Sequence, residues 1–153
     1  MPGRFSVNYM MRLALDQARQ AQSNGEVPVG AVLVLQDKTI ILGNNSVIRQ
    51  NDPTLHAEIE VIRKGCKIAN NYRLINSELY VTLEPCSMCY GAITQARIRK
   101  LFFGAYDKNT GVCGSCNNLI TSNCFNHKPE VIGGVLEKDC SLILNNFFKE
   151  KRN

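Results

Sequence analysis

The stretch Leu79-Tyr-Val-Thr-Leu-Glu-Pro-Cys-Ser-Met-Cys89 decides how this chain folds, because it passes from an apolar strand through a turn into a helix. Cys86 and Cys89 are three positions apart, and side chains at this spacing share one face of a helix. Pro85 suits a helix start, where its missing N–H is not needed. The partial positive charge of a helix N-terminus favours the thiolate, the form of cysteine that binds metals. The pair therefore predicts half of a tetrahedral zinc site.

A third candidate ligand, His56, lies upstream of the two cysteines. It follows Asp52-Pro-Thr-Leu55 and precedes a helical run over residues 57–64. Along the side of a helix, His56 and Glu58 would point about 200° apart, but around the open first turn both can bend toward a point near the axis. We therefore expect two helices to direct their N-termini at one metal ion. Three protein ligands leave one position for water, as a catalytic zinc requires, and leave Glu58 free for proton transfer.

Hydrophobic periodicity arranges the rest of the chain around this site. Two apolar strands separated by polar residues predict an antiparallel hairpin, and a strand–helix–strand unit around the cysteines predicts two parallel strands. The expected fold is α/β, a single domain over residues 1–153 with three α-β-α layers, in which helices cover both faces of a five-stranded mixed sheet. In chain order the pattern predicts a helix over 8–22, strands over 30–35 and 39–42, a helix over 55–69, a strand over 79–83, the cysteine helix over 86–96, a strand over 100–104, a short helix over 117–122, a strand over 131–135 and a helix over 138–150.

Composition restricts the class of protein and its surroundings. The 153 residues are 44% hydrophobic and 20% charged, which is ordinary for a globular domain. No run approaches the ~18 apolar residues of a membrane span, and the first six residues lack the apolar core of a signal peptide, so cytoplasmic residence is expected. Seven cysteines, an odd number, argue against a disulfide framework. The net charge of +5 permits a polyanionic partner without identifying one.

His-x-Glu followed by Pro-Cys-x-x-Cys is the signature of zinc-dependent nucleobase deaminases. Over nearly its whole length the chain resembles one branch of that cytidine-deaminase-like superfamily, the bacterial tRNA-specific adenosine deaminases. The matching stretches are residues 26–32, Asn45, residues 52–58, 71–74, 79–89 and 103–105, Asp107 and residues 110–111.

The resemblance implies a cytidine-deaminase-like fold and hydrolytic deamination of the wobble adenosine of a tRNA anticodon to inosine. It implies one Zn²⁺ per chain, a tRNA anticodon stem-loop as partner, and a homodimer. By the same resemblance, Phe148 in the last helix contacts the anticodon loop. The expected site comprises the ligands His56, Cys86 and Cys89, the catalytic Glu58, and the nucleotide-pocket residues Asn45, Asp107 and Asn126.

The expected reaction follows from these roles. Zinc at this site would lower the pKa of a bound water toward neutrality. Glu58 would take a proton from that water, deliver it to N1 of adenine and later protonate the departing amine. Attack at C6 then releases ammonia and leaves inosine.

Other interpretations remain open from the sequence. The same zinc motif would serve a deaminase of free cytosine, cytidine or guanine, and a zinc-stabilised RNA-binding module would use the ligands without catalysis. A lone Cys-x-x-Cys is also compatible with a redox pair, and a structural zinc could take Glu58 as its fourth ligand. Cys113 and Cys116 form a second Cys-x-x-Cys with Cys124 and His127 nearby, which could bind a second metal. Cys66 and Cys140 fall in apolar helical patterns and are expected in the core.

Overall fold

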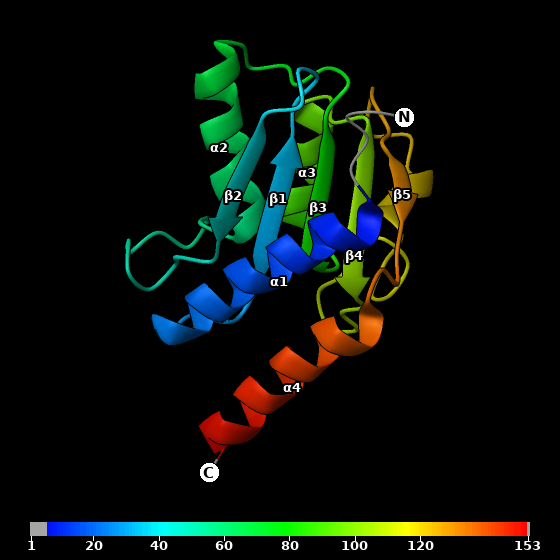
Figure 1. Cartoon of the computed structure of the whole chain (residues 1–153). Helices are drawn as coiled ribbons and strands as arrows, with labels where there is room; N and C mark the ends of the chain where they lie inside the picture. Colours follow the sequence, from blue (N-terminus) through cyan, green and yellow to red (C-terminus); the bar gives the residue numbers. More distant parts are fainter. Residues whose placement is uncertain (1–5, 153) are drawn as a thin grey trace.

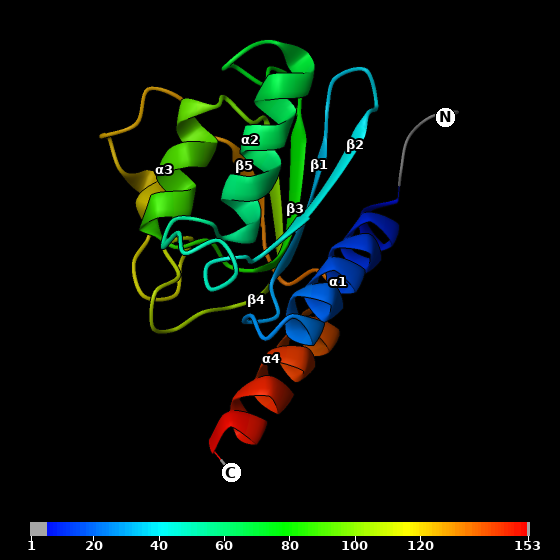
Figure 2. The same ribbon diagram turned by 90° about the vertical axis from the view of Figure 1, so that its left-hand side faces the viewer.

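A five-stranded mixed sheet with the strand order β2-β1-β3-β4-β5 forms the centre of the protein. The computed structural model describes residues 6–152, so residues 1–5, where a signal peptide was considered, lie outside it. Helices α2 and α3 cover one face of the sheet and α1 and α4 the other, which confirms the predicted three-layer α/β fold (Figures 1 and 2). The elements are α1 (Val7–Ser23), β1 (Gly30–Val34), β2 (Ile40–Asn44), α2 (Ala57–Ala69), β3 (Glu78–Leu83), α3 (Ser87–Gln95), β4 (Lys100–Ala105), the 3₁₀ helix η1 (Leu119–Thr121), β5 (Glu130–Ile132) and α4 (Glu137–Arg152).

Strand directions confirm both pairings expected from the sequence. Strands β1 and β2 form the antiparallel hairpin, and β1 also pairs antiparallel with β3. Strands β3 and β4, joined by α3, run parallel, as do β4 and β5. The carboxyl ends of β3 and β4 therefore meet at one edge of the sheet, the usual place for a ligand site in such folds. The segment that carries Cys86 begins at this edge.

Two helices begin slightly later than their sequence patterns predict. His56 and Cys86 are the N-cap residues of α2 and α3, with extended backbones (φ −68°, ψ 159° and φ −78°, ψ 175°). An N-cap residue stands at the open end of its helix, so its side chain can point along the axis and not out from the side. The last strand is also shorter than expected, because Gly133 and Gly134 follow it instead of extending it.

Helix α1 lies unusually close to the sheet. Its inner face carries small residues, including the fully buried Ala14 and Ala18, and it faces Gly30 at the start of β1. A Cβ atom on Gly30 would stand 1.9 Å from the carbonyl oxygen of Ala14 and 2.5 Å from the amide nitrogen of Ala18. The absence of a side chain at Gly30 therefore sets the distance between this layer and the sheet. Within residues 6–152, no helix has the length and apolar character needed to cross a membrane.

We expect Gly30→Ala to destabilise the protein by about 1–3 kcal/mol, because the new methyl group can be accommodated only by moving the backbone of α1. Gly91→Ala is the matched control, since a Cβ on Gly91 meets nothing within 4 Å. Gly91 lies inside α3, where alanine is favoured by roughly 1 kcal/mol. Urea unfolding of both variants measures the difference. Equal stability of the two variants would contradict the close packing of α1.

Candidate active site and metal centre

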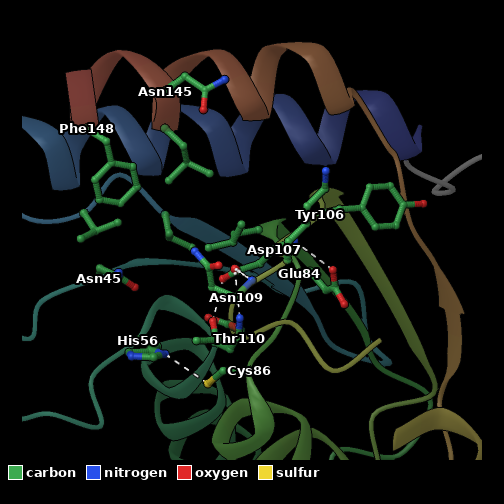
Figure 3. Close-up of a pocket in the computed structure, with 16 residues that line it drawn as sticks. Asn45, His56, Glu84, Cys86, Tyr106, Asp107, Asn109, Thr110, Asn145 and Phe148 are labelled. Carbon is green, nitrogen blue, oxygen red and sulfur yellow. Dashed lines mark hydrogen bonds between the residues drawn. The ribbon is translucent and has the colours of Figure 1, made fainter. Parts of the chain in front are cut away.

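The N-terminal ends of α2 and α3 bring three metal-binding side chains together. Nδ1 of His56 lies 3.6 Å from Sγ of Cys86 and 3.4 Å from Sγ of Cys89. Each of the three residues places a ligand atom within 4.8 Å of the other two. Within residues 6–152, they form the only cluster of three or more His, Cys, Asp and Glu side chains arranged for a metal ion. Figure 3 shows His56 and Cys86 facing one another from the two helices.

The spacing and chemistry of these side chains fit zinc. Tetrahedral zinc with Zn–S near 2.3 Å and Zn–N near 2.0 Å places a nitrogen and a sulfur ligand about 3.5 Å apart. The two observed nitrogen–sulfur distances, 3.6 and 3.4 Å, match this value. Imidazole and thiolate groups also bind zinc in preference to magnesium or calcium, which favour oxygen ligands. The group can therefore hold one zinc ion with three protein ligands.

The two thiols and the imidazole are electrostatically coupled. A hydrogen bond from Cys89, together with one from His56, lowers the pKa of Cys86 to about 4. The same hydrogen bond to Cys86, with burial, raises the pKa of Cys89. The pKa of His56 is raised mainly by its hydrogen bond to Cys86. One cysteine is thus a thiolate at neutral pH, and a bound cation would displace the proton that remains on the other.

Glu58 is buried beside the metal ligands, with only 3% of its surface exposed. It is the second residue of α2 and lines the same cavity as His56 and Cys86. Burial raises the pKa of its carboxyl group from 4.5 to about 7. A carboxyl group with a pKa near neutrality can both take up and release a proton, as a general acid–base catalyst must.

Asn45 caps the helix that carries His56 and Glu58. Its Oδ1 accepts a hydrogen bond of 2.8 Å from the backbone N–H of Ala57, while His56 makes no side-chain capping bond. Asn45 belongs to the loop that follows β2, twelve residues before the N–H that it caps. No local sequence pattern indicates this long-range cap, which the sequence analysis therefore missed.

An open cavity of about 490 Å³ extends from the metal ligands to helix α4. In Figure 3, His56 and Cys86 lie at one side of the cavity, and Asn145 and Phe148 of α4 lie across from them. Phe148 keeps 44% of its surface exposed, whereas its neighbour Phe147 is buried in the core. The cavity is lined by Val27, Val29, Asn45, His56, Glu58, Leu83, Glu84, Cys86, Tyr106, Asp107, Lys108, Asn109, Thr110, Leu144, Asn145 and Phe148.

The structure brings three of the four expected nucleotide-binding residues to this cavity. Asn45, Asp107 and Phe148 line it, but Asn126 does not. Asn126 instead lines a separate cavity of about 60 Å³ near the end of α3. The carboxylate of Asp107 mainly stabilises its own turn, since it accepts hydrogen bonds from the N–H groups of Asn109 and Thr110 and from the Thr110 hydroxyl.

The remaining cysteines do not form a second metal site in the described part of the chain. Cys113 is buried and Cys116 is exposed, while Nε2 of His127 lies 2.7 Å from the carbonyl oxygen of Ile98. Cys140 is fully buried, as expected from its helical pattern, and Cys66 is only partly buried.

A His/Cys/Cys metal centre with a spare buried carboxylate, at the edge of an α/β sheet, defines a zinc-dependent deaminase. The model of the cytidine and deoxycytidylate deaminase zinc-binding region matches residues 6–105. A tRNA-specific adenosine deaminase from Haemophilus influenzae is 52% identical over 144 residues, covering 94% of this chain and 83% of the relative. The chain therefore belongs to the cytidine and deoxycytidylate deaminase family and, within it, to the tRNA-specific adenosine deaminases.

Solved structures agree with this assignment. One, from a study of A-to-I editing by tRNA:A34 deaminases at the wobble position of transfer RNA, has a TM-score of 0.85 and 44% identity, and the match covers 89% of this chain and 99% of that one. A guanine deaminase from Bacillus subtilis matches less completely, with a TM-score of 0.63 and 38% identity over 67% of this chain and 66% of that one.

We expect Cys86→Ala to abolish stoichiometric zinc binding, because two remaining ligands cannot hold the ion against chelators. Cys116→Ala is the matched control and should keep one zinc per chain, since this exposed cysteine lies outside the cluster. Metal analysis of the dialysed proteins gives the result. A full zinc equivalent in Cys86→Ala would refute the ligand assignment.

Proposed function

We propose that this protein deaminates the wobble adenosine of a tRNA anticodon to inosine, using zinc held by His56, Cys86 and Cys89 with Glu58 as the catalytic residue. The proposal depends chiefly on one observation: three zinc-competent side chains form a cluster, and two of them, His56 and Cys86, line an open cavity together with the buried carboxylate of Glu58. The 52% identity to a tRNA-specific adenosine deaminase over 94% of this chain supports adenosine in tRNA as the substrate.

Glu58 carries the proton transfers of the proposed reaction. His56, Cys86 and Cys89 would hold the zinc, which would lower the pKa of a water molecule bound to it. Glu58 would accept a proton from that water and pass it to N1 of adenine while the water oxygen forms a bond to C6. Glu58 would then take the second proton from the oxygen now bonded to C6 and give it to the amino group, so that the C6–N bond breaks, the C6=O bond forms and ammonia leaves. A carboxyl pKa of about 7 suits both directions of transfer.

The cavity offers groups for a nucleotide that has been turned out of its loop. Because Oδ1 of Asn45 is held by Ala57, the amide nitrogen is the group that this residue presents to a base. The exposed ring of Phe148 can stack on a neighbouring base, and Lys108 brings a positive charge toward the phosphates. A single-stranded anticodon loop can place a base here at little cost in stacking.

We further propose that the chain acts as one deaminase domain, as a homodimer, in the cytoplasm. The single continuous sheet supports one domain, and the family resemblance supports the dimer. Seven free cysteines suit a reducing compartment such as the cytoplasm. Light scattering of the purified protein tests the dimer: a monomer mass at micromolar concentration would contradict it.

Glu58→Gln should keep one zinc per chain and lose at least roughly 10³-fold in kcat, because the amide cannot shuttle a proton. The variant has nearly the same shape as the wild type, so folding should be preserved. Glu130→Gln is the control, because its side chain is 64% exposed on the edge strand and should leave activity unchanged. Inosine formation per zinc-loaded chain is the measurement. Undiminished turnover in Glu58→Gln would exclude the proposed role.

The substrate itself is tested by offering an anticodon stem-loop with a wobble adenosine alongside free cytosine, guanine and adenosine. We expect inosine in the stem-loop, detected by mass spectrometry of the digested RNA, and no comparable ammonia release from the free compounds. Faster release of ammonia from guanine or cytosine would instead indicate a free-base deaminase. Absence of reaction with every substrate would favour a zinc-stabilised RNA-binding module.

A further inference from the structure

Glu84 is a buried carboxylate that the deamination chemistry does not use. It is the first residue after β3 and has 2% of its surface exposed. Its Oε1 accepts hydrogen bonds from the N–H of Asp107 (3.0 Å) and from the hydroxyl of Ser115, and its Oε2 accepts from the N–H groups of Cys113 (2.8 Å) and Ser115 (3.2 Å). An ionised carboxylate has about four acceptor positions, so these four donors use its whole capacity.

The segment 107–115 encloses this carboxylate. A Cβ atom on Gly111 would stand 2.4 Å from Cδ of Glu84, so the backbone passes directly over the carboxyl group. The N–H of Gly111 donates to the carbonyl oxygen of Asp107 (2.9 Å), and the N–H of Val112 donates to that of Pro85 (3.0 Å). The segment is therefore closed on itself and is held to residues 84–85 by backbone and side-chain hydrogen bonds.

The same segment forms one wall of the substrate cavity. Lys108, Asn109 and Thr110 all line it, together with Asp107. Glu84 stands two residues before Cys86. One short stretch of backbone therefore carries both a metal ligand and the carboxylate that binds the segment 107–115. Figure 3 shows Glu84 hydrogen-bonded to Asp107 at this junction.

We propose that Glu84 is a positioning residue, which fixes the wall 107–115 relative to Cys86 so that the wall can bind the target nucleotide. With both oxygens occupied by protein donors, Glu84 has no free acceptor to offer the substrate. It lies outside the ion pairs found among residues 6–152, so its hydrogen-bond partners are three backbone N–H groups and the Ser115 hydroxyl, and not a cation. The inference extends the proposed function and rests on it for the identity of the nucleotide.

Glu84→Gln tests the proposal with almost no change of shape. Whichever way the amide is oriented, its NH₂ group replaces one oxygen and confronts at least one backbone N–H: that of Asp107 at the Oε1 position, or those of Cys113 and Ser115 at the Oε2 position. The amides of residues 107, 113 and 115 should then exchange with deuterium roughly tenfold to a hundredfold faster, as expected when hydrogen bonds to a charged group are lost. Exchange in α2 and α3 and a zinc content of one per chain should not change.

Kinetics should show a rise in KM for the anticodon stem-loop of at least roughly tenfold, while kcat per zinc-loaded chain falls less than about threefold, because the wall contributes binding and not chemistry. Glu78→Gln is the matched control. Glu78 is the first residue of β3, the strand that Glu84 follows, and its carboxylate accepts hydrogen bonds from the side chains of Tyr80 and Arg99. This variant should leave exchange in 107–115 and KM unchanged.

Ser115→Ala supplies a second, independent variant through a double-mutant cycle. Ser115→Ala alone should raise KM by a few-fold, and its effect should be smaller in the Glu84→Gln background, because both changes act on the hydrogen bond between these two side chains. Full additivity, an unchanged KM in Glu84→Gln, a loss confined to kcat, or loss of zinc from that variant would each overturn the proposal. If the wild type does not deaminate the stem-loop, the proposed function fails, whereas the exchange experiment still decides whether Glu84 holds the wall.

Discussion

The approach of two helix N-termini to one point is the arrangement on which the site depends. Two positive helix ends would repel each other, so they need negative charge between them. The thiolate of Cys86 supplies it, and the spacing of Cys86, Cys89 and His56 leaves room for a cation that draws both thiolates in. His56 and Cys86 are the N-cap residues of α2 and α3, but neither side chain makes a capping hydrogen bond, and Asn45 caps α2 instead. The residues at which the two helices begin are thus also metal ligands.

Buried carboxylates hold both loops that border this centre. Glu26, 1% exposed, accepts hydrogen bonds from the N–H groups of Ile48 (3.0 Å) and Arg49 (2.8 Å), in the loop that carries Asn45. Glu84 does the same for the segment that carries Asp107. Loops without regular structure are otherwise the most mobile parts of a fold. The hydrogen bonds to Glu26 and Glu84 restrain the two loops that border the cavity, while the metal ligands themselves lie at the ends of helices.

Local patterns were sufficient to predict the helices, the strands and the shared helix face of Cys86 and Cys89, because spacing and the alternation of apolar segments are properties of neighbouring residues. Contacts between distant residues were not predictable in this way. The cap that Asn45 places on α2 joins residues twelve positions apart, and the enclosure of Glu84 depends on a loop more than twenty residues away. Asn126 was grouped with the pocket by resemblance alone, and within one chain the fold places it in another cavity.

The proposed function depends on the geometry of the metal centre. X-ray absorption at the zinc edge of the purified protein tests that geometry most directly. The arrangement of His56, Cys86 and Cys89 predicts two sulfur ligands at about 2.3 Å and two nitrogen or oxygen ligands at about 2.0 Å, one from the imidazole and one from solvent. Four sulfur ligands, or a shell with no sulfur, would show that the two helix ends do not share a metal ion.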